Sequence, residues 1–307
     1  MKGSERSGLL IALAGFALFT CGDAVTKSIA GAWSPLAVAA LRFTLGAVVT
    51  GVPLYFREGV GAFIPQNPWL QLARGVSLGT GTLGFFCAIF LMPLTVAVSI
   101  TFVAPAIAAL LSRPLLGERV RPVTWVSVIV AFTGVLIVLR PNVMALGWPA
   151  FLPLLTALGM SLLIISNRAS AGQGSALSMQ FFVAAGAAVL LIIAALVGNA
   201  SGIAMLHIGW PDWTVIARCL VVTGTGTIGH WMVYVGTTRA GASTIAPATY
   251  IQLLASTALG WIFFNNSPDL VTMAGAAVII SAGLLMWWDA RRRVNAAIRE
   301  TRALQGR

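Results

Sequence analysis

Ten stretches of about 20 mostly apolar residues follow one another along this 307-residue chain. A helix needs roughly 20 such residues to cross the hydrocarbon core of a membrane. Hydrophobic residues make up 58% of the chain and charged residues only 9%, far from the balance of a soluble domain. We therefore expect an all-α integral membrane protein with ten spanning helices, at residues 8–29, 35–56, 69–91, 94–112, 122–139, 148–168, 175–197, 213–236, 242–264 and 270–288.

Charge and cysteine usage exclude several other classes of protein. The net charge of +11 does not indicate a nucleic-acid partner, because the basic residues stand singly between apolar runs or in one cluster at residues 291–293. The three cysteines lie inside apolar stretches without CxxC spacing, and the chain has only two histidines. We therefore predict no disulfide framework, no metal site and no cofactor.

The distribution of basic residues predicts the orientation in the membrane. An even number of spans places both termini on the same side, and cytoplasmic loops are enriched in lysine and arginine. Fifteen of the nineteen lysines and arginines fall on the side of the termini in this arrangement. We expect a multi-pass membrane protein with both termini cytoplasmic and a basic tail at residues 289–307.

A six-residue phrase occurs twice, as GTGTLG at residues 79–84 and as GTGTIG at residues 224–229. The match continues in register at Ala97 and Ala242 and at Ile100 and Ile245. The chain is thus predicted to consist of two related halves, at residues 8–140 and 148–288. Five spans per half is an odd number, so the second half enters the membrane inverted. Transporters with inverted repeats place substrate near the midplane between the halves, and we expect the functional cavity there.

Both copies of the phrase match the dinucleotide-binding pattern GxGxxG, but their context is wrong for it. That pattern needs a preceding strand and a following acidic residue, whereas both copies lie inside apolar spans. Small residues at this spacing let helices pack closely in lipid. We predict helix packing, with backbone lining of the cavity as the alternative, for Gly79, Gly81, Gly84, Gly224, Gly226 and Gly229.

Two prolines follow the phrase at comparable distances, Pro105 in the fourth span and Pro247 in the ninth. A proline inside a helix removes one hydrogen bond and leaves a carbonyl oxygen free. The free carbonyl either accepts a hydrogen bond from substrate or remains part of a simple bend. We predict hinges at both positions.

Asp23 and Lys27 are charged residues inside the first span. They are four residues apart, hence on one face of a helix, and charged groups in a membrane usually face the bundle interior. Either they form a mutually neutralising structural pair, or Asp23 orients Lys27 toward an anionic group of the substrate. Arg42, seven residues into the second span, is predicted to share Asp23 as counter-ion and is a second candidate for substrate contact.

Other polar residues inside spans are candidates for binding or coupling. Arg74 and Arg218 lie nearer helix ends and are predicted to be interfacial anchors. His230 is a candidate proton carrier, as is Asp23, although a structural histidine fits the sequence equally well. Substrate contact is predicted for Trp231, Tyr234, Tyr250 and Gln252. Packing in the core is the alternative for the deep aromatic residues Trp231, Tyr234 and Trp261. No span holds paired carboxylates and no Ser/His/Asp set appears, which argues against an enzyme.

The order of these motifs resembles the drug/metabolite transporter superfamily, specifically its ten-helix EamA type. The residues that carry the resemblance are Gly22-Asp23-x-x-x-Lys27, Leu41-Arg42-Phe43, Arg74-Gly75, Pro105, Ala246-Pro247-x-x-Tyr250-Ile251-Gln252-Leu253 and Gly260-Trp261. Asn265 and Asn266 depart from the type, which usually has an acidic residue after the ninth span.

The resemblance implies a secondary transporter that works by alternating access without ATP. Within this type, the chain most resembles uptake carriers for S-adenosylmethionine or riboflavin, because it has an acidic residue four positions before a lysine in the first span. We therefore expect a small-molecule substrate of the vitamin or cofactor type, with riboflavin as the first candidate. An exporter of amino acids or small organic anions and a non-transporting scaffold are the alternatives. The bilayer is the other expected partner, and a homodimer is left open.

Overall fold

The computed structural model describes residues 3–117, 122–170, 172–240, 245–267 and 269–305, which form helices and turns without a strand. In this part of the chain eight helical segments are long and apolar enough to cross a membrane, one of which, Leu94–Ser112, consists of two consecutive helices, and Ala248–Phe264 is a shorter apolar helix. The all-helical membrane fold predicted from the sequence is confirmed. The elements are α1 Gly3–Lys27, α2 Pro35–Glu58, η1 Val60–Phe63, α3 Pro68–Leu91, α4 Leu94–Thr101, α5 Ala104–Leu116, α6 Pro122–Leu146, η2 Trp148–Phe151, α7 Leu152–Ala169, α8 Ala176–Ala200, η3 Ala204–Leu206, α9 Trp213–Ala240, η4 Ala246–Tyr250, α11 Ile251–Phe264 and α12 Leu270–Gln305.

Several helices begin at the turn signals of the sequence. Pro68 is the first residue of α3, where its missing N–H costs no helical hydrogen bond. The side-chain oxygen of Asn67 accepts a hydrogen bond from the Leu70 N–H at 3.1 Å. At the start of α8 the Ser175 hydroxyl oxygen accepts from the Ser178 N–H at 3.0 Å. These caps satisfy amides that no helical carbonyl can reach, and they fix where each span begins.

The fourth predicted span is interrupted in the structure. The N–H groups of Phe102 and Val103 donate to carbonyls three residues back, and this tight turn separates α4 from α5. Pro105 is the second residue of α5. In the ninth predicted span Pro247 is the second residue of the 3-10 helix η4, which leads directly into α11. Residues 241–244 lie outside the described part of the chain. Both prolines therefore stand at helix discontinuities.

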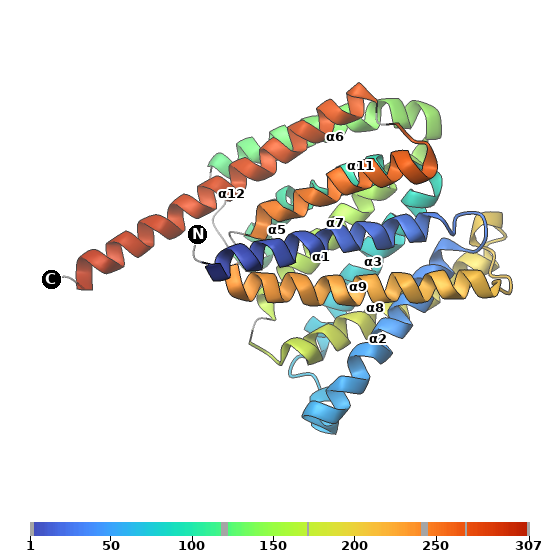
Figure 1. The fold of residues 1–307 in the computed structure, drawn as a ribbon, viewed down its shortest axis with the longest axis horizontal. Coiled ribbons are helices and arrows are strands. Elements are labelled where there is room, and N and C mark those ends of the chain that lie inside the picture. Colours follow the sequence, from blue (N-terminus) through green and yellow to red (C-terminus); the bar gives the residue numbers. More distant parts are fainter. Residues whose placement is uncertain (1–2, 118–121, 171, 241–244, 268, 306–307) are drawn as a thin grey trace.

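The helices before residue 147 pack mainly against the helices that follow it. Helix α1 lies along α9, α2 along α8, α3 against α7 and α8, and α6 along α12, as Figure 1 shows for α1 with α9 and for α6 with α12. The buried core fills the space between these pairs, with Ile89, Leu94, Ile100, Val138 and Ile279 almost fully enclosed. A group on an inner face of α1 or α2 thus lies close to the other half of the chain.

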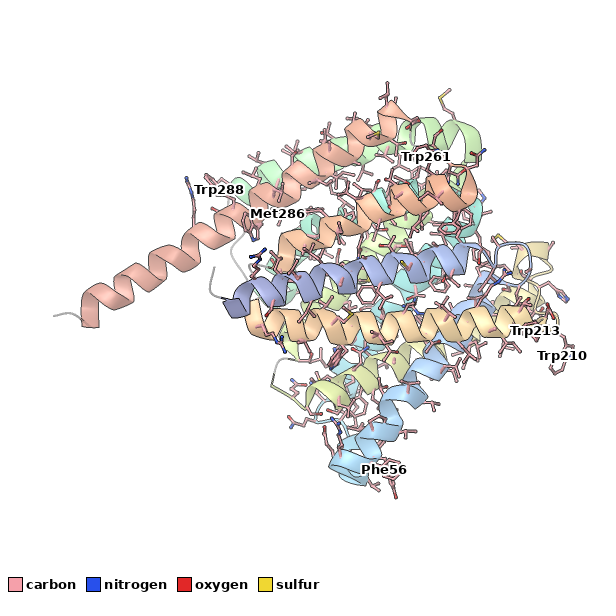
Figure 2. The ribbon with its side chains drawn as sticks, viewed as in Figure 1. Phe56, Trp210, Trp213, Trp261, Met286 and Trp288 are labelled. Atoms are coloured by element: carbon pink, nitrogen blue, oxygen red, sulfur yellow. The ribbon has the colours of Figure 1, made fainter. Side chains whose placement is uncertain are left out.

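Large aromatic side chains mark the ends of the bundle. Trp210 and Trp213 lie at one end of the molecule and Trp288 toward the other (Figure 2). Trp213 is 74% exposed and Trp210 fully exposed. Exposed tryptophans at helix ends are typical of the two membrane interfaces. The spanning part of the molecule lies between these two levels.

Candidate functional site

Three titratable side chains from three helices form the centre of the candidate site. The charges of Asp23 on α1 and Arg42 on α2 interact with each other, and the charge of Arg42 also interacts with His230 on α9. Arg42 lies seven residues after Pro35, about 10 Å along the helix at 1.5 Å per residue. The carboxylate of Asp23 is therefore close enough to interact with the charge of Arg42, and α9 adds a histidine to the cluster.

Aromatic rings border this charged cluster. The guanidinium carbon of Arg42 lies 5.0 Å from the ring centre of Phe43 and 5.5 Å from that of Phe86 on α3. At these distances the ring faces attract the cation. The rings of Phe19 and His230 meet edge to face with centres 4.7 Å apart. Apolar surface thus stands beside groups that donate and accept hydrogen bonds, a composition common in binding sites for small molecules.

The backbone of α9 takes part in the same cluster. Nδ1 of His230 lies 2.9 Å from the carbonyl oxygen of Gly226, one helical turn earlier. The His230 side chain is exposed in the isolated chain, whereas Asp23 and Arg42 are half-buried. All three side chains are thus at least partly exposed in the isolated chain.

Lys27 does not belong to this cluster. The Asp23–Lys27 ion pair that the spacing predicts is not formed among the residues that the structure describes. The ammonium nitrogen of Lys27 instead donates to the carbonyl oxygens of Ile89 at 2.8 Å and Met92 at 2.7 Å, where α3 ends. It also lies 5.5 Å from the ring centre of Phe264 on α11. The unpaired carbonyls at a helix C-terminus attract a cation, and this attraction draws Lys27 away from Asp23.

Replacement of Lys27 by methionine is expected to destabilise the fold. Ile89 and Met92 are buried, and losing the ammonium leaves their carbonyls without its hydrogen bonds, at a cost of about 2–4 kcal/mol. The melting temperature of the purified protein in detergent measures this loss. Lys27→Arg, which keeps a charged donor, is expected to melt near the parent. Loss of uptake at unchanged melting temperature would contradict this structural role.

Tyr250 and Gln252 were predicted to contact substrate, and the structure places both at the interruption between η4 and α11. The ring of Tyr250 packs against that of Phe102, which stands at the corresponding interruption after α4, with centres 5.3 Å apart and planes tilted by 43°. Its hydroxyl lies against Gly283 of α12, where an added Cβ would collide with it. Gln252 is half-buried on α11. Tyr250 thus joins the two discontinuities, and ligand contact by either residue stays a prediction.

Two of the three aromatic residues for which core packing was the alternative are exposed in the structure. Trp231 is 64% exposed on α9 and Trp261 is 63% exposed on α11. Core packing was therefore wrong for these two, because the sequence does not say which face of a uniformly apolar helix points outward. The side chain of Tyr234 lies outside the described part of the chain. Substrate contact by Trp231 and Tyr234 remains untested.

The first copy of the repeated phrase packs helices together. A Cβ added at Gly79 would lie 2.8 Å from a Leu190 side-chain carbon on α8, and one at Gly84 would lie 2.8 Å from the Leu152 carbonyl on α7. Around Gly81 the nearest atom is the Thr156 carbonyl oxygen at 3.4 Å. In the second copy Gly229 packs against α1, where its Cβ would lie 3.1 Å from the Gly15 oxygen, and Gly224 faces open space.

Arg74 was predicted to be an interfacial anchor, and this prediction was wrong. The side chain is only 6% exposed. Its Nε donates to Asn167 at the end of α7 at 2.8 Å, and its Nη1 donates to Gln71 and to the Met179 carbonyl at the start of α8. This network joins one helix of the first half to two of the second. Arg218, by contrast, is exposed and donates to the Ser28 carbonyl at 2.9 Å.

Phe19, Phe86 and the carbonyl of Gly226 are members of the site that sequence reasoning missed. Phe19 stands four residues before Asp23, so helical spacing places it on the same face. No signal in the sequence marks Phe86, because its contact with Arg42 joins helices distant in the chain. Among the described residues no group of three or more histidine, cysteine or acidic side chains is suited to hold a metal ion.

Comparison with known proteins shows what this chain is similar to. Residues 6–140 match the model of the EamA-like transporter family. A riboflavin transporter of Rhizobium johnstonii is 27% identical over 80% of this chain and 79% of its own length. An S-adenosylmethionine uptake transporter of Rickettsia prowazekii is 24% identical over 89% of this chain and 90% of its own. A pseudopaline exporter of Pseudomonas aeruginosa is 23% identical over 90% and 94%.

A solved crystal structure supports the same architecture. It is 22% identical to this chain, covers 94% of it and 98% of its own chain, and superposes with a TM-score of 0.57. This likeness concerns the fold. The family match and the names of the relatives indicate a transporter and not an enzyme. The chain is thus a multi-pass helical membrane protein whose residues 6–140 match the EamA-like transporter family, and it is similar over most of its length to proteins named as transporters.

Proposed function

We propose that this transporter takes up a flat, polar, vitamin-like substrate, with riboflavin as the specific candidate. The observation that carries the proposal is the cluster of Asp23, Arg42 and His230 bordered by the rings of Phe19 and Phe86. A planar heterocycle has apolar faces and polar edges, so rings beside hydrogen-bonding groups suit it. The similarity to a riboflavin transporter over 80% of the chain supports this choice.

Transport proceeds, in this proposal, by alternating access of two inverted halves at residues 8–140 and 148–288. Subtracting residue 79 from residue 224 gives a repeat offset of 145 residues, which relates α1 to α7 and α3 to α9. The pairing of α1 with α9 then corresponds to the pairing of α7 with α3, and both pairings are present. The charged cluster lies where α1 and α2 meet α9, so relative motion of the halves alters its exposure.

The cluster also supplies groups for proton coupling. Asp23 and His230 are able to gain and lose protons, and each interacts with Arg42, whose charge is fixed. Protonation of either group changes the net charge that a substrate meets. We place the protein in a bacterial inner (plasma) membrane with both termini cytoplasmic. Protons enter the cell down their gradient, so coupled uptake of riboflavin would be a symport.

Export of amino acids or small organic anions is the second candidate. Arg42 is a cation that suits a carboxylate, and a relative similar over 90% of the chain is named as a pseudopaline exporter. The two candidates differ in the ligand that stabilises the purified protein and in the direction of net flux.

Riboflavin is expected to raise the melting temperature of the purified protein. Ligand at a hundred times its Kd adds about 2.7 kcal/mol of stability, whereas S-adenosylmethionine, amino acids and dicarboxylates should add less. Uptake of labelled riboflavin into proteoliposomes, with and without an imposed proton gradient, is the second measurement. A shift with amino acids or dicarboxylates alone would exclude the vitamin carrier, and uptake indifferent to the gradient would exclude proton coupling.

A further inference from the structure

Gly226, the middle glycine of the second repeated phrase, faces the guanidinium of Arg42. None of the other five glycines in the two copies faces a charged side chain. A Cβ added at Gly226 would lie 2.9 Å from Nη2 of Arg42 and 3.6 Å from its guanidinium carbon. Its counterpart in the first copy, Gly81, instead faces the Thr156 carbonyl and Met160 of a packed helix. Gly226 thus leaves a notch on α9, and the guanidinium of Arg42 lies in it.

The same peptide unit contacts the histidine. Nδ1 of His230 lies 2.9 Å from the Gly226 carbonyl oxygen. A carbonyl oxygen only accepts hydrogen bonds, so Nδ1 must be the donor. A neutral ring with its proton on Nδ1 keeps Nε2 as an acceptor. One residue of α9 therefore contacts the fixed cation of the cluster and also selects which nitrogen of His230 is free.

The guanidinium is the far end of a flexible side chain, but it has neighbours that a retreat from an added methyl group would disturb. It lies near the faces of Phe43 and Phe86, and its charge interacts with that of Asp23. A methyl at residue 226 would have to displace it from these neighbours. Glycine is also a poorer helix former than alanine. A glycine at this position therefore lowers the stability of α9.

We infer that Gly226 is a positioning residue of the substrate site: its missing side chain seats Arg42 against α9, and its carbonyl holds His230 with Nε2 free to accept from the ligand. The inference rests on the proposed role of the cluster in substrate binding. It adds a chemical requirement, because a ligand that meets Nε2 must offer an N–H or O–H donor next to an acceptor for Arg42. The imide edge of riboflavin offers both.

A double-mutant cycle tests the seating of Arg42. Gly226→Ala is expected to raise the KM for riboflavin uptake roughly tenfold with a smaller change in the maximal rate. Gly224→Ala is the matched control, since a Cβ there meets nothing within 4 Å, and it should leave KM unchanged. In ligand-free protein, Gly226→Ala should lower the melting temperature by several degrees when Arg42 is present and hardly at all in an Arg42→Gln background.

The melting temperatures are measured without substrate. They therefore test the contact between Gly226 and Arg42 even if riboflavin proves not to be transported. An equal loss in both backgrounds would show that Gly226 serves helix packing and would overturn the inference. If Arg42→Gln does not fold, Arg42→Lys replaces it, because its slimmer ammonium should relieve most of the clash. Unchanged KM and unchanged melting temperature in Gly226→Ala would likewise overturn the inference.

A separate experiment measures which ring nitrogen of His230 carries the proton. The chain has two histidines, and His207→Gln leaves His230 as the only one. In protein labelled with ¹⁵N-histidine, at a pH where the ring is neutral, the nitrogen shifts should report a proton on Nδ1. A ring protonated on Nε2 would overturn the role assigned to the Gly226 carbonyl.

Discussion

Asp23→Asn and Arg42→Gln should each lower riboflavin uptake by roughly ten- to a hundredfold, because one charge-assisted hydrogen bond contributes about 1.5–3 kcal/mol to binding. Each single change also leaves the other charge without its partner inside the membrane. We expect this to cost about 2.5–3.5 kcal/mol of stability, the penalty for a charged residue at the centre of a span.

The double variant Asp23→Asn with Arg42→Gln separates these two effects. Removing both charges leaves no uncompensated group, so its melting temperature should return close to that of the parent. Uptake should remain low, because neither functional group is present. Exposed neighbours on α2 provide matched controls, and Glu58→Gln and Arg57→Gln should change neither property. A double variant that melts below both single variants would refute the electrostatic link between the two helices.

Gly159→Ala is expected to be the most disruptive change to the fold. Gly159 on α7 faces α3 so closely that an added Cβ would lie 2.7 Å from the Cα of Gly81 and 2.7 Å from the Ser77 carbonyl oxygen. Both atoms belong to backbone, so α3 and α7 must separate to make room. Overpacking of this kind costs about 1–3 kcal/mol or more, and the better helix propensity of alanine returns only about 1 kcal/mol.

Gly46→Ala on α2 is the control for this experiment, because a Cβ at that position meets nothing within 4 Å. It gains the same helix propensity without a clash, so it should melt at or above the parent temperature. The yield of monodisperse protein and its melting temperature in detergent compare the two variants. If Gly159→Ala melts with or above Gly46→Ala, then α3 and α7 do not pack through these glycines in the membrane.

Much of the fold could be predicted from hydropathy alone. Inside a bilayer every backbone hydrogen bond must be made internally, so a long apolar run has few alternatives to a helix. The helix starts at Pro68 and Ser175 follow from local turn and cap chemistry. The helix interruption before Pro105 follows from the missing amide of proline. These features depend on residues close together in the chain, which is why the sequence reveals them.

The site was predictable only in part. Asp23, Arg42 and His230 stood out because charged and titratable groups inside a span are rare and face the interior. The pairing of Asp23 with Lys27 failed because the spacing shows only that two residues are able to meet. The carbonyls of Ile89 and Met92, more than 60 residues away, compete for the same ammonium. The prediction that Arg74 is an interfacial anchor failed because its distance from the helix end does not reveal which other helices cover that end.

The sequence by itself determined the helical class of the fold, the start of several helices, the repeated phrase and the small set of groups that carry charge inside the membrane. Only the tertiary structure decided how the two copies of the phrase differ in use. In the first copy the glycines face neighbouring helices, and in the second Gly226 faces the guanidinium of Arg42. The reason is physical: a glycine specifies only that space is free beside the backbone, and the packing of α2 against α9 determines which group fills it.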